Sequence, residues 1–115
     1  MGRKALLYLD RPQIFTCLKC GTHLSSAEQI LSKQFHGRGG KAYLFHSAVN
    51  VSVGPLERRS LLTGMHTVCD IFCKRCDDCV GWKYHAAEEE SQQYKVGKFI
   101  LEKTRLGKED WPPKP

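Results

Sequence analysis

Apolar and polar residues alternate over short stretches of this chain, which predicts strands more often than helices. Residues 49–53 alternate strictly, as a half-buried strand does, and they close the most strand-like region, residues 41–53. Residues 29–35 have mixed periodicity and fit either a strand or a short helix. The other predicted strands are 13–17, a short strand ending at 61–64, 66–72, 81–84 and a final strand at 97–102. Together they predict one β-rich domain.

Glycine and proline indicate where these strands end. Residues 21–26 and Gly54-Pro55 are expected to be turns, and 36–40, with three glycines, a flexible loop. That loop lacks the spacing of a phosphate-binding motif. Residues 86–93 are expected to form a loop with one helical turn. The chain therefore divides into an N-terminal segment (1–12), a domain (13–104) and a flexible C-terminal tail (105–115).

Length and composition restrict the class of protein. The chain has 115 residues, of which 41% are hydrophobic and 26% charged, as is typical of one globular domain. No apolar run approaches the roughly 20 residues of a membrane helix. The apolar run at residues 5–9 is ended by Asp10-Arg11, too early for a signal peptide. We expect a soluble, intracellular protein without membrane contact.

Six cysteines in such a chain need an explanation, because a reducing compartment keeps thiols unpaired. Cys17 and Cys20 form one Cys-x-x-Cys pair, and Cys73 and Cys76 form another. Each pair presents two sulfurs to one ion, and the two pairs complete a tetrahedral thiolate site for one Zn²⁺. About 52 residues separate the pairs, so the metal would join two distant parts of the fold. Four protein ligands leave no position for water or substrate, so we expect a structural zinc.

The remaining two cysteines have no assigned role. Cys69 is expected inside the strand at 66–72, whereas Cys79, three residues after Cys76, is the better candidate for a substitute ligand or a reactive thiol. For both, a buried or incidental thiol is the simpler expectation. Cations inside the pairs favour the thiolate form of the ligands. They are Lys19, Lys74 and Arg75.

The net charge of +6 raises the question of nucleic-acid binding. The cations are spread over both halves of the chain, and the acidic run Glu88-Glu89-Glu90 opposes a continuous basic surface. Direct nucleic-acid binding is therefore not expected. The five histidines show no His-x-Glu or His-Glu-x-x-His pattern, so the zinc chemistry of hydrolases and deaminases is not expected either.

The cysteine pairs belong to a longer pattern that resembles the Yippee-like family. The resemblance covers roughly residues 13–103, and the segment Gly81-Trp82-Lys83-Tyr84 after the second pair is part of it. The other stretches that carry it are Gly40-Lys41-Ala42-Tyr43-Leu44-Phe45, Val49-Asn50-Val51, Leu62-Thr63-Gly64 with His66 and Val68, Asp70-Ile71, Ser91-Gln92, Tyr94-Lys95 and 97–102. The short N-terminal start is similar to the branch of the family that contains Yippee-like 5.

This resemblance implies an all-β fold, a β-tent of two antiparallel sheets joined by a structural four-cysteine zinc site. It implies a protein of the nucleus and cytoplasm that is not an enzyme and acts through protein partners. In the Yippee-like 5 branch these partners are subunits of a ubiquitin ligase of the GID/CTLH type. The expected role is that of an accessory or adaptor subunit of such a ligase.

Two relatives of the β-tent fold suggest alternatives. Trp82 and Tyr84 resemble an aromatic pair in the ligand cage of cereblon, whose other tryptophans are missing here. A groove lined by Phe45, His66, Trp82 and Tyr84 would bind a small ligand or a modified peptide, and core packing of these aromatics is the competing expectation. Kinship with methionine sulfoxide reductase B suggests a reductase-like enzyme. Cys79 is its sole candidate thiol, and the catalytic segment of that enzyme is absent.

Overall fold

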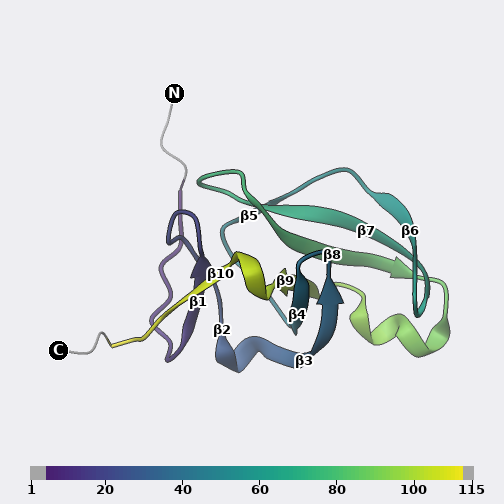
Figure 1. Ribbon diagram of the computed structural model, residues 1–115, viewed down its shortest axis with the longest axis horizontal. Helices are drawn as coiled ribbons and strands as arrows, with labels where there is room; N and C mark the ends of the chain where they lie inside the picture. The colour runs from purple at the N-terminus through teal and green to yellow at the C-terminus, as the bar shows by residue number, and fades with distance from the viewer. Residues whose placement is uncertain (1–4, 113–115) are drawn as a thin grey trace.

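Residues 5–112, the part of the chain that this computed structural model describes, form two antiparallel sheets (Figure 1). The smaller sheet has three strands in the order β10-β1-β2 and lies at one end of the larger one, to the left in Figure 1. Its strands are β1 (Ile14–Cys17), β2 (His23–Ser26) and β10 (Leu106–Glu109). The all-β fold that the sequence predicted is confirmed.

The larger sheet has seven strands in the order β3-β4-β9-β8-β7-β5, with β6 paired to β7. The strands are β3 (Ile30–Gly37), β4 (Gly40–Phe45), β5 (Val51–Val53), β6 (Glu57–Leu61), β7 (Gly64–Cys73), β8 (Cys79–Ala87) and β9 (Phe99–Glu102). Three 3-10 helices connect them: η1 (Ala27–Gln29), η2 (Glu90–Lys95) and η3 (Lys103–Arg105). No helix within residues 5–112 is long and apolar enough to cross a membrane.

Alternation along the central strands divides the apolar residues between two cores. In β4 and β9, Phe45 and Leu101 point toward the smaller sheet, whereas Leu44 and Ile100 point away from it. The first core therefore joins the two sheets: Phe15, Cys17, Leu24, Phe45, Ile71, Cys73, Val80 and Leu101. The second lies on the outer face of the larger sheet: Ala42, Leu44, Val68, Tyr84 and Ile100.

The glycine-rich segment 36–40, expected to be a flexible loop, is instead a tight hairpin. Gly37 pairs with Gly40, so only Arg38 and Gly39 connect β3 to β4. Residues 29–35, for which strand and helix were both open, lie mostly in β3, and β2 occupies most of the turn expected at 21–26. The error arises because glycine permits both loops and two-residue hairpins, and composition does not distinguish them.

The chain beyond residue 104 differs most from its expected form. The sequence predicted a last strand ending at Glu102 and a flexible tail over 105–115, yet β10 pairs with β1 along its whole length. Gly107 faces Thr16, and a Cβ at this glycine would lie 2.8 Å from the Thr16 hydroxyl. The glycine that hides the strand in the sequence thus leaves room for the Thr16 side chain on the neighbouring strand. Residues 113–115 lie outside the described residues.

The N-terminal segment is held against the smaller sheet without forming a strand. The Asn50 side chain accepts a hydrogen bond from the Leu7 N–H at 2.7 Å and donates one to the Leu7 carbonyl at 2.8 Å. It donates another to the His23 carbonyl, while the Leu9 N–H donates to His23 Nδ1 at 2.8 Å. Asn50 is 8% exposed, so its amide is a buried clamp on the backbone of Leu7 and on His23, which in turn holds Leu9.

Candidate metal centre and pocket

The four cysteines of the two Cys-x-x-Cys pairs meet at one point. Their sulfurs all lie within 4.8 Å of one another, with Cys17 and Cys76 Sγ atoms 3.6 Å apart and those of Cys20 and Cys73 3.5 Å apart. None of them forms a disulfide. Zinc–sulfur bonds of about 2.3 Å in a tetrahedron separate the sulfurs by roughly 3.8 Å. The donor set and its spacing therefore fit Zn²⁺.

Both pairs sit on the same backbone turn. In each, the carbonyl of the first cysteine accepts a hydrogen bond from the N–H four residues later: Gly21 to Cys17 at 2.7 Å, and Asp77 to Cys73 at 2.8 Å. Gly21 and Asp77 both have positive φ, 77° and 63°. The cysteines end β1 and β7, so the turn at the end of each strand carries two of the four sulfurs. One of these turns belongs to the smaller sheet and the other to the larger sheet, so the cysteine cluster joins the two sheets.

Protonation of the thiols differs within the cluster. Burial raises the pKa of Cys17 to about 12. Burial acts in the same direction on Cys20, but hydrogen bonds from Thr22, whose hydroxyl lies 3.1 Å from the sulfur, lower its pKa to about 7. Since zinc binds thiolates, metal binding has to displace protons from this cluster. Four sulfurs complete the tetrahedron, and the cluster offers structural support with no open position for a reacting group.

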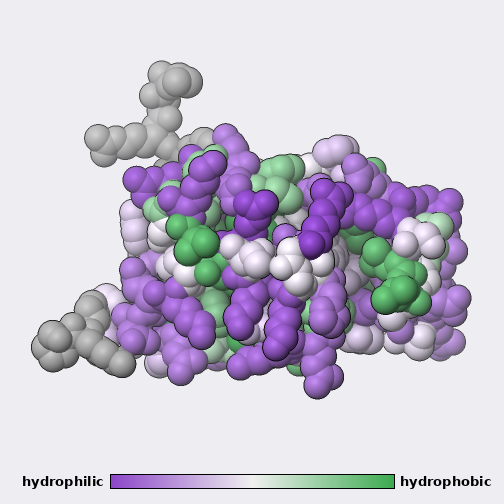
Figure 2. All heavy atoms as spheres, viewed as in Figure 1, coloured by the Kyte–Doolittle hydropathy of each residue, from purple (hydrophilic) through white to green (hydrophobic). Residues whose placement is uncertain are grey.

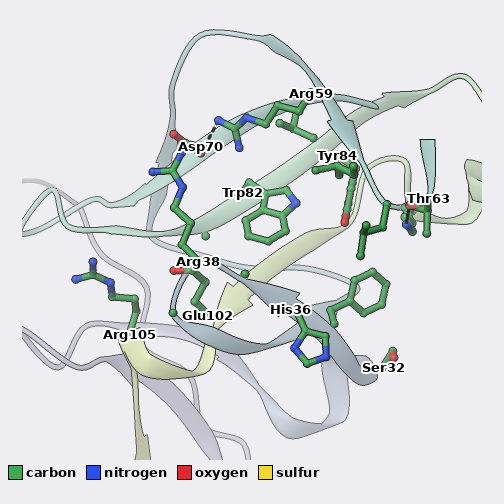
Figure 3. Close-up of a pocket in the computed structure, with 18 of the residues that line it drawn as sticks. Ser32, His36, Arg38, Arg59, Thr63, Asp70, Trp82, Tyr84, Glu102 and Arg105 are labelled. Carbon is green, nitrogen blue, oxygen red and sulfur yellow. Dashed lines mark hydrogen bonds and ion pairs between the residues drawn. The ribbon is translucent and has the colours of Figure 1, made fainter. Parts of the chain in front are cut away.

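A cavity of about 1160 Å³ opens on the outer face of the larger sheet (Figure 3). Trp82 and Tyr84 line it from β8, with ring centroids 6.4 Å apart in an edge-to-face arrangement. Their position two residues apart places both on one side of the strand, as expected. Asp70 is the cross-strand neighbour of Trp82 in β7 and forms an ion pair with Arg59 at 3.0 Å, and Arg38 extends toward them from the β3–β4 hairpin (Figure 3).

Phe45 and His66, expected beside Trp82 and Tyr84, do not line this cavity. Phe45 is fully buried in the core between the sheets, with its ring centroid 5.5 Å from that of Phe15. His66 does lie beside Tyr84, with ring centroids 5.4 Å apart, but it is 1% exposed and its Nδ1 lies 2.9 Å from the Gly64 carbonyl, so it packs in the interior and not at the cavity surface. Phe45 does not reach the cavity because side chains alternate along β4, which directs this one to the other face of the sheet.

Three further residues line the cavity that no sequence pattern placed there. Lys95 and Thr63 meet in the cavity wall through a 3.0 Å hydrogen bond, and Phe35 lies beside them from β3. The one sequence signal was that Thr63 and Lys95 stand in stretches that carry the family resemblance. Nothing in the sequence brings these distant positions together.

The two remaining cysteines lie away from the metal cluster. Cys69 is buried in β7 at 4% exposure. Cys79 is at the cavity, with its sulfur 3.7 Å from the Gly81 carbonyl, and burial raises its pKa. A raised pKa keeps this thiol protonated at neutral pH, which is the opposite of what a reductase nucleophile requires.

Known proteins resemble this chain in sequence and in fold. Residues 13–109 match the family model described as "Yippee zinc-binding/DNA-binding /Mis18, centromere assembly". A "Protein yippee-like" of Solanum tuberosum is 53% identical over 106 residues, covering 92% of this chain and 81% of its own. Human "Protein yippee-like 4" is 48% identical over 104 residues, covering 90% and 82%. The crystal structure of the Mis18 "Yippee-like" domain aligns with a TM-score of 0.67 at 17% identity, covering 85% of this chain and 95% of that one.

Proposed function

Because the chain belongs to the Yippee-Mis18 family, we propose that it is a zinc-braced interaction module that binds other proteins and catalyses no reaction. The observation that carries this is the closed cluster of four cysteine sulfurs, two attached to each sheet. Such a cluster holds one structural Zn²⁺ and leaves the metal no catalytic position. In this function Cys17, Cys20, Cys73 and Cys76 hold the ion, and the binding surface lies elsewhere.

We place the binding surface around the cavity. Its rim carries Leu62, which is fully exposed, and Tyr94, which is 58% exposed. Figure 2 shows that polar and charged side chains cover most of one face of the molecule, with apolar side chains gathered in separate patches. Exposed large apolar side chains beside a cavity are typical of an interaction site.

The proposed setting is a ubiquitin ligase of the GID/CTLH type, in the nucleus and cytoplasm, with this chain as an accessory or adaptor subunit. Support comes from the family resemblance. Affinity purification from the native cell, followed by mass spectrometry, tests it. Wild type should recover ligase scaffold subunits, and the rim variant Leu62→Asp should recover less, while Leu7→Asp, at an exposed side chain that does not line the cavity, serves as the control. Recovery of other proteins in their absence would refute the ligase setting.

Direct DNA binding, which the family description mentions, is not what we propose for this chain. At the cavity Arg59 pairs with Asp70, and Arg105 pairs with Asp78 at 3.5 Å, so these cations are already engaged. Fluorescence anisotropy with a duplex of about 20 base pairs decides the matter. Micromolar affinity that falls steeply with added salt would replace protein binding with nucleic-acid binding.

The second candidate function is that of a reader of a small ligand or modified peptide. The observation that favours it is the cavity itself, with Trp82 and Tyr84 on one wall. Titration with cyclic imides and degron-like peptides, followed through the Trp82 indole signal by NMR, tests it. An unmoved indole signal across the whole set would remove this candidate.

A further inference from the structure

A lysine side chain is buried in the wall of the cavity. Lys95 ends η2 and is 3% exposed, although lysine is almost never fully buried unless paired. Its ammonium donates a hydrogen bond to the Thr63 hydroxyl at 3.0 Å. It also lies 5.3 Å from the ring centroid of Phe35, 5.4 Å from that of Tyr84 and 6.0 Å from that of Tyr94. Three aromatic rings and one hydroxyl thus surround a single cation.

Within residues 5–112, no carboxylate forms an ion pair with this ammonium. The two acidic residues of the cavity make other contacts: Asp70 pairs with Arg59, and Glu102 accepts the Arg38 backbone N–H at 2.9 Å. A buried charge is costly unless it is paired, and ring faces compensate for only part of the lost hydration. Burial accordingly lowers the pKa of Lys95. Among the described residues, nothing in the cavity wall balances the charge of the protonated Lys95.

We propose that the cavity binds a peptide that carries a carboxylate, and that this carboxylate binds the Lys95 ammonium. The inference rests on the second candidate function, that the cavity binds a ligand at all. A carboxylate has the charge and the acceptor oxygens that the site lacks, and the ammonium has three donors of which Thr63 takes one.

The surroundings favour a peptide over a small metabolite, because the lining residues extend over β3, β6, β7, β8 and β9. Leu62 and Tyr94 at the rim offer apolar contacts to neighbouring peptide residues. Arg38, which also lines the cavity, extends toward Asp70 (Figure 3) and adds a second cation to the lining. The carboxylate can belong to a peptide C-terminus or to an acidic side chain.

The experiment uses the full, zinc-loaded chain and three pools of N-acetylated pentapeptides. One pool has a free C-terminal carboxylate and no acidic residue, one has a C-terminal amide and no acidic residue, and one has a C-terminal amide and one Glu. The indole N–H signal of Trp82 reports binding, and Trp111→Phe assigns it. We expect the signal to shift with one or both carboxylate pools and not with the uncharged pool. The responding pool identifies the source of the carboxylate.

Lys95→Met removes the charge and keeps most of the side-chain volume. It should weaken binding of the responding pool by about tenfold or more, the usual effect of losing a hydrogen bond to a charged group. Lys95→Arg should retain part of the affinity. Zinc content and signal dispersion show whether each variant is folded, and the comparison of pools in wild type does not depend on any variant.

The possible failures are distinguishable. Equal shifts with charged and uncharged pools, or a folded Lys95→Met that binds as wild type does, would overturn the role of Lys95 and leave the ligand-binding function standing. A Trp82 signal that no pool shifts would overturn both together. Neither result concerns the zinc-braced scaffold.

Discussion

Replacing Cys76 by serine should remove the zinc and unfold the protein. Cys76 supplies one of four sulfurs, and its Sγ lies 3.6 Å from that of Cys17 on the other turn. Serine offers a poor ligand in place of a thiolate, so the ion loses a contact between the two sheets. The core between the sheets then becomes their main connection.

The structure sets the size of this effect. The metal closes a loop of about 57 residues from Cys17 to Cys73, and closing such a loop stabilises a fold by about 4 kcal/mol through chain entropy. Zinc binding by small domains is worth about 10 kcal/mol or more. A domain of this size has roughly 5–15 kcal/mol of stability in total. The variant should lose at least about 4 kcal/mol, which lowers the melting temperature by roughly 15 °C or abolishes folding.

Cys79→Ser is the matched control, three residues further along the chain. Cys79 lies outside the metal cluster and its side chain is partly exposed, so the cost should be about 1 kcal/mol. Thermal unfolding by circular dichroism, with zinc measured in the same samples by elemental analysis, gives both quantities. If the two variants melt within a few degrees of each other, or if Cys76→Ser keeps a full equivalent of zinc, the cross-linking role is refuted.

Three further predictions concern sites away from the metal. Gly81→Ala should destabilise the fold by about 1–3 kcal/mol in urea unfolding, because a Cβ there would lie 1.8 Å from the Ile100 carbonyl oxygen in β9. Gly54→Ala is the control, because the atom nearest to its Cβ belongs to the movable Phe72 ring. Asn50→Gly keeps the positive φ of 58° but removes the side-chain amide, so amide hydrogen exchange at Leu7 and Leu9 should accelerate while the two sheets stay protected. Unchanged exchange at Leu7 and Leu9 would contradict the clamp. Burial lowers the pKa of Lys95, so the folded state binds this proton less tightly than the unfolded state does. The resulting cost to folding stability is fully present below the lowered pKa and absent above about 10.4, the pKa of a free lysine. Any stability gained by Lys95→Met should therefore shrink as the pH rises toward 10, and a gain independent of pH would contradict a charge effect.

The metal cluster could be predicted from the sequence because its chemistry is local. Each Cys-x-x-Cys turn specifies two ligands within four residues, and a tetrahedral ion then requires the two turns to meet, whatever path the chain takes between them. The turn even has a repeated signature, since Gly21 and Asp77 occupy equivalent positions with positive φ. Glycine is the usual choice there, and an aspartate in the second turn is harder to recognise.

Strand positions followed from alternation wherever an apolar side chain fills every second position. β10 was missed because Gly107, Lys108 and Glu109 carry no apolar pattern, and a glycine opposite Thr16 is not a sequence signal for a strand. The hairpin at Arg38 and Gly39 was missed for a related reason, because glycine-rich composition indicates a turn without giving its length.

The cavity depends on distances that no local pattern contains. Trp82 and Tyr84 were placed on one face by the two-residue period of a strand, and Phe45 was misplaced because that period says nothing of which face of β4 adjoins which face of β8. Lys95 shows the limit most clearly, since in the sequence it is a surface-type residue at the end of a polar segment. Only pairing of β6, β7 and β8 brings Thr63 and Tyr84 to the same ammonium and buries it. A charged residue buried without an ion-pair partner is therefore visible only once the strands are placed in space.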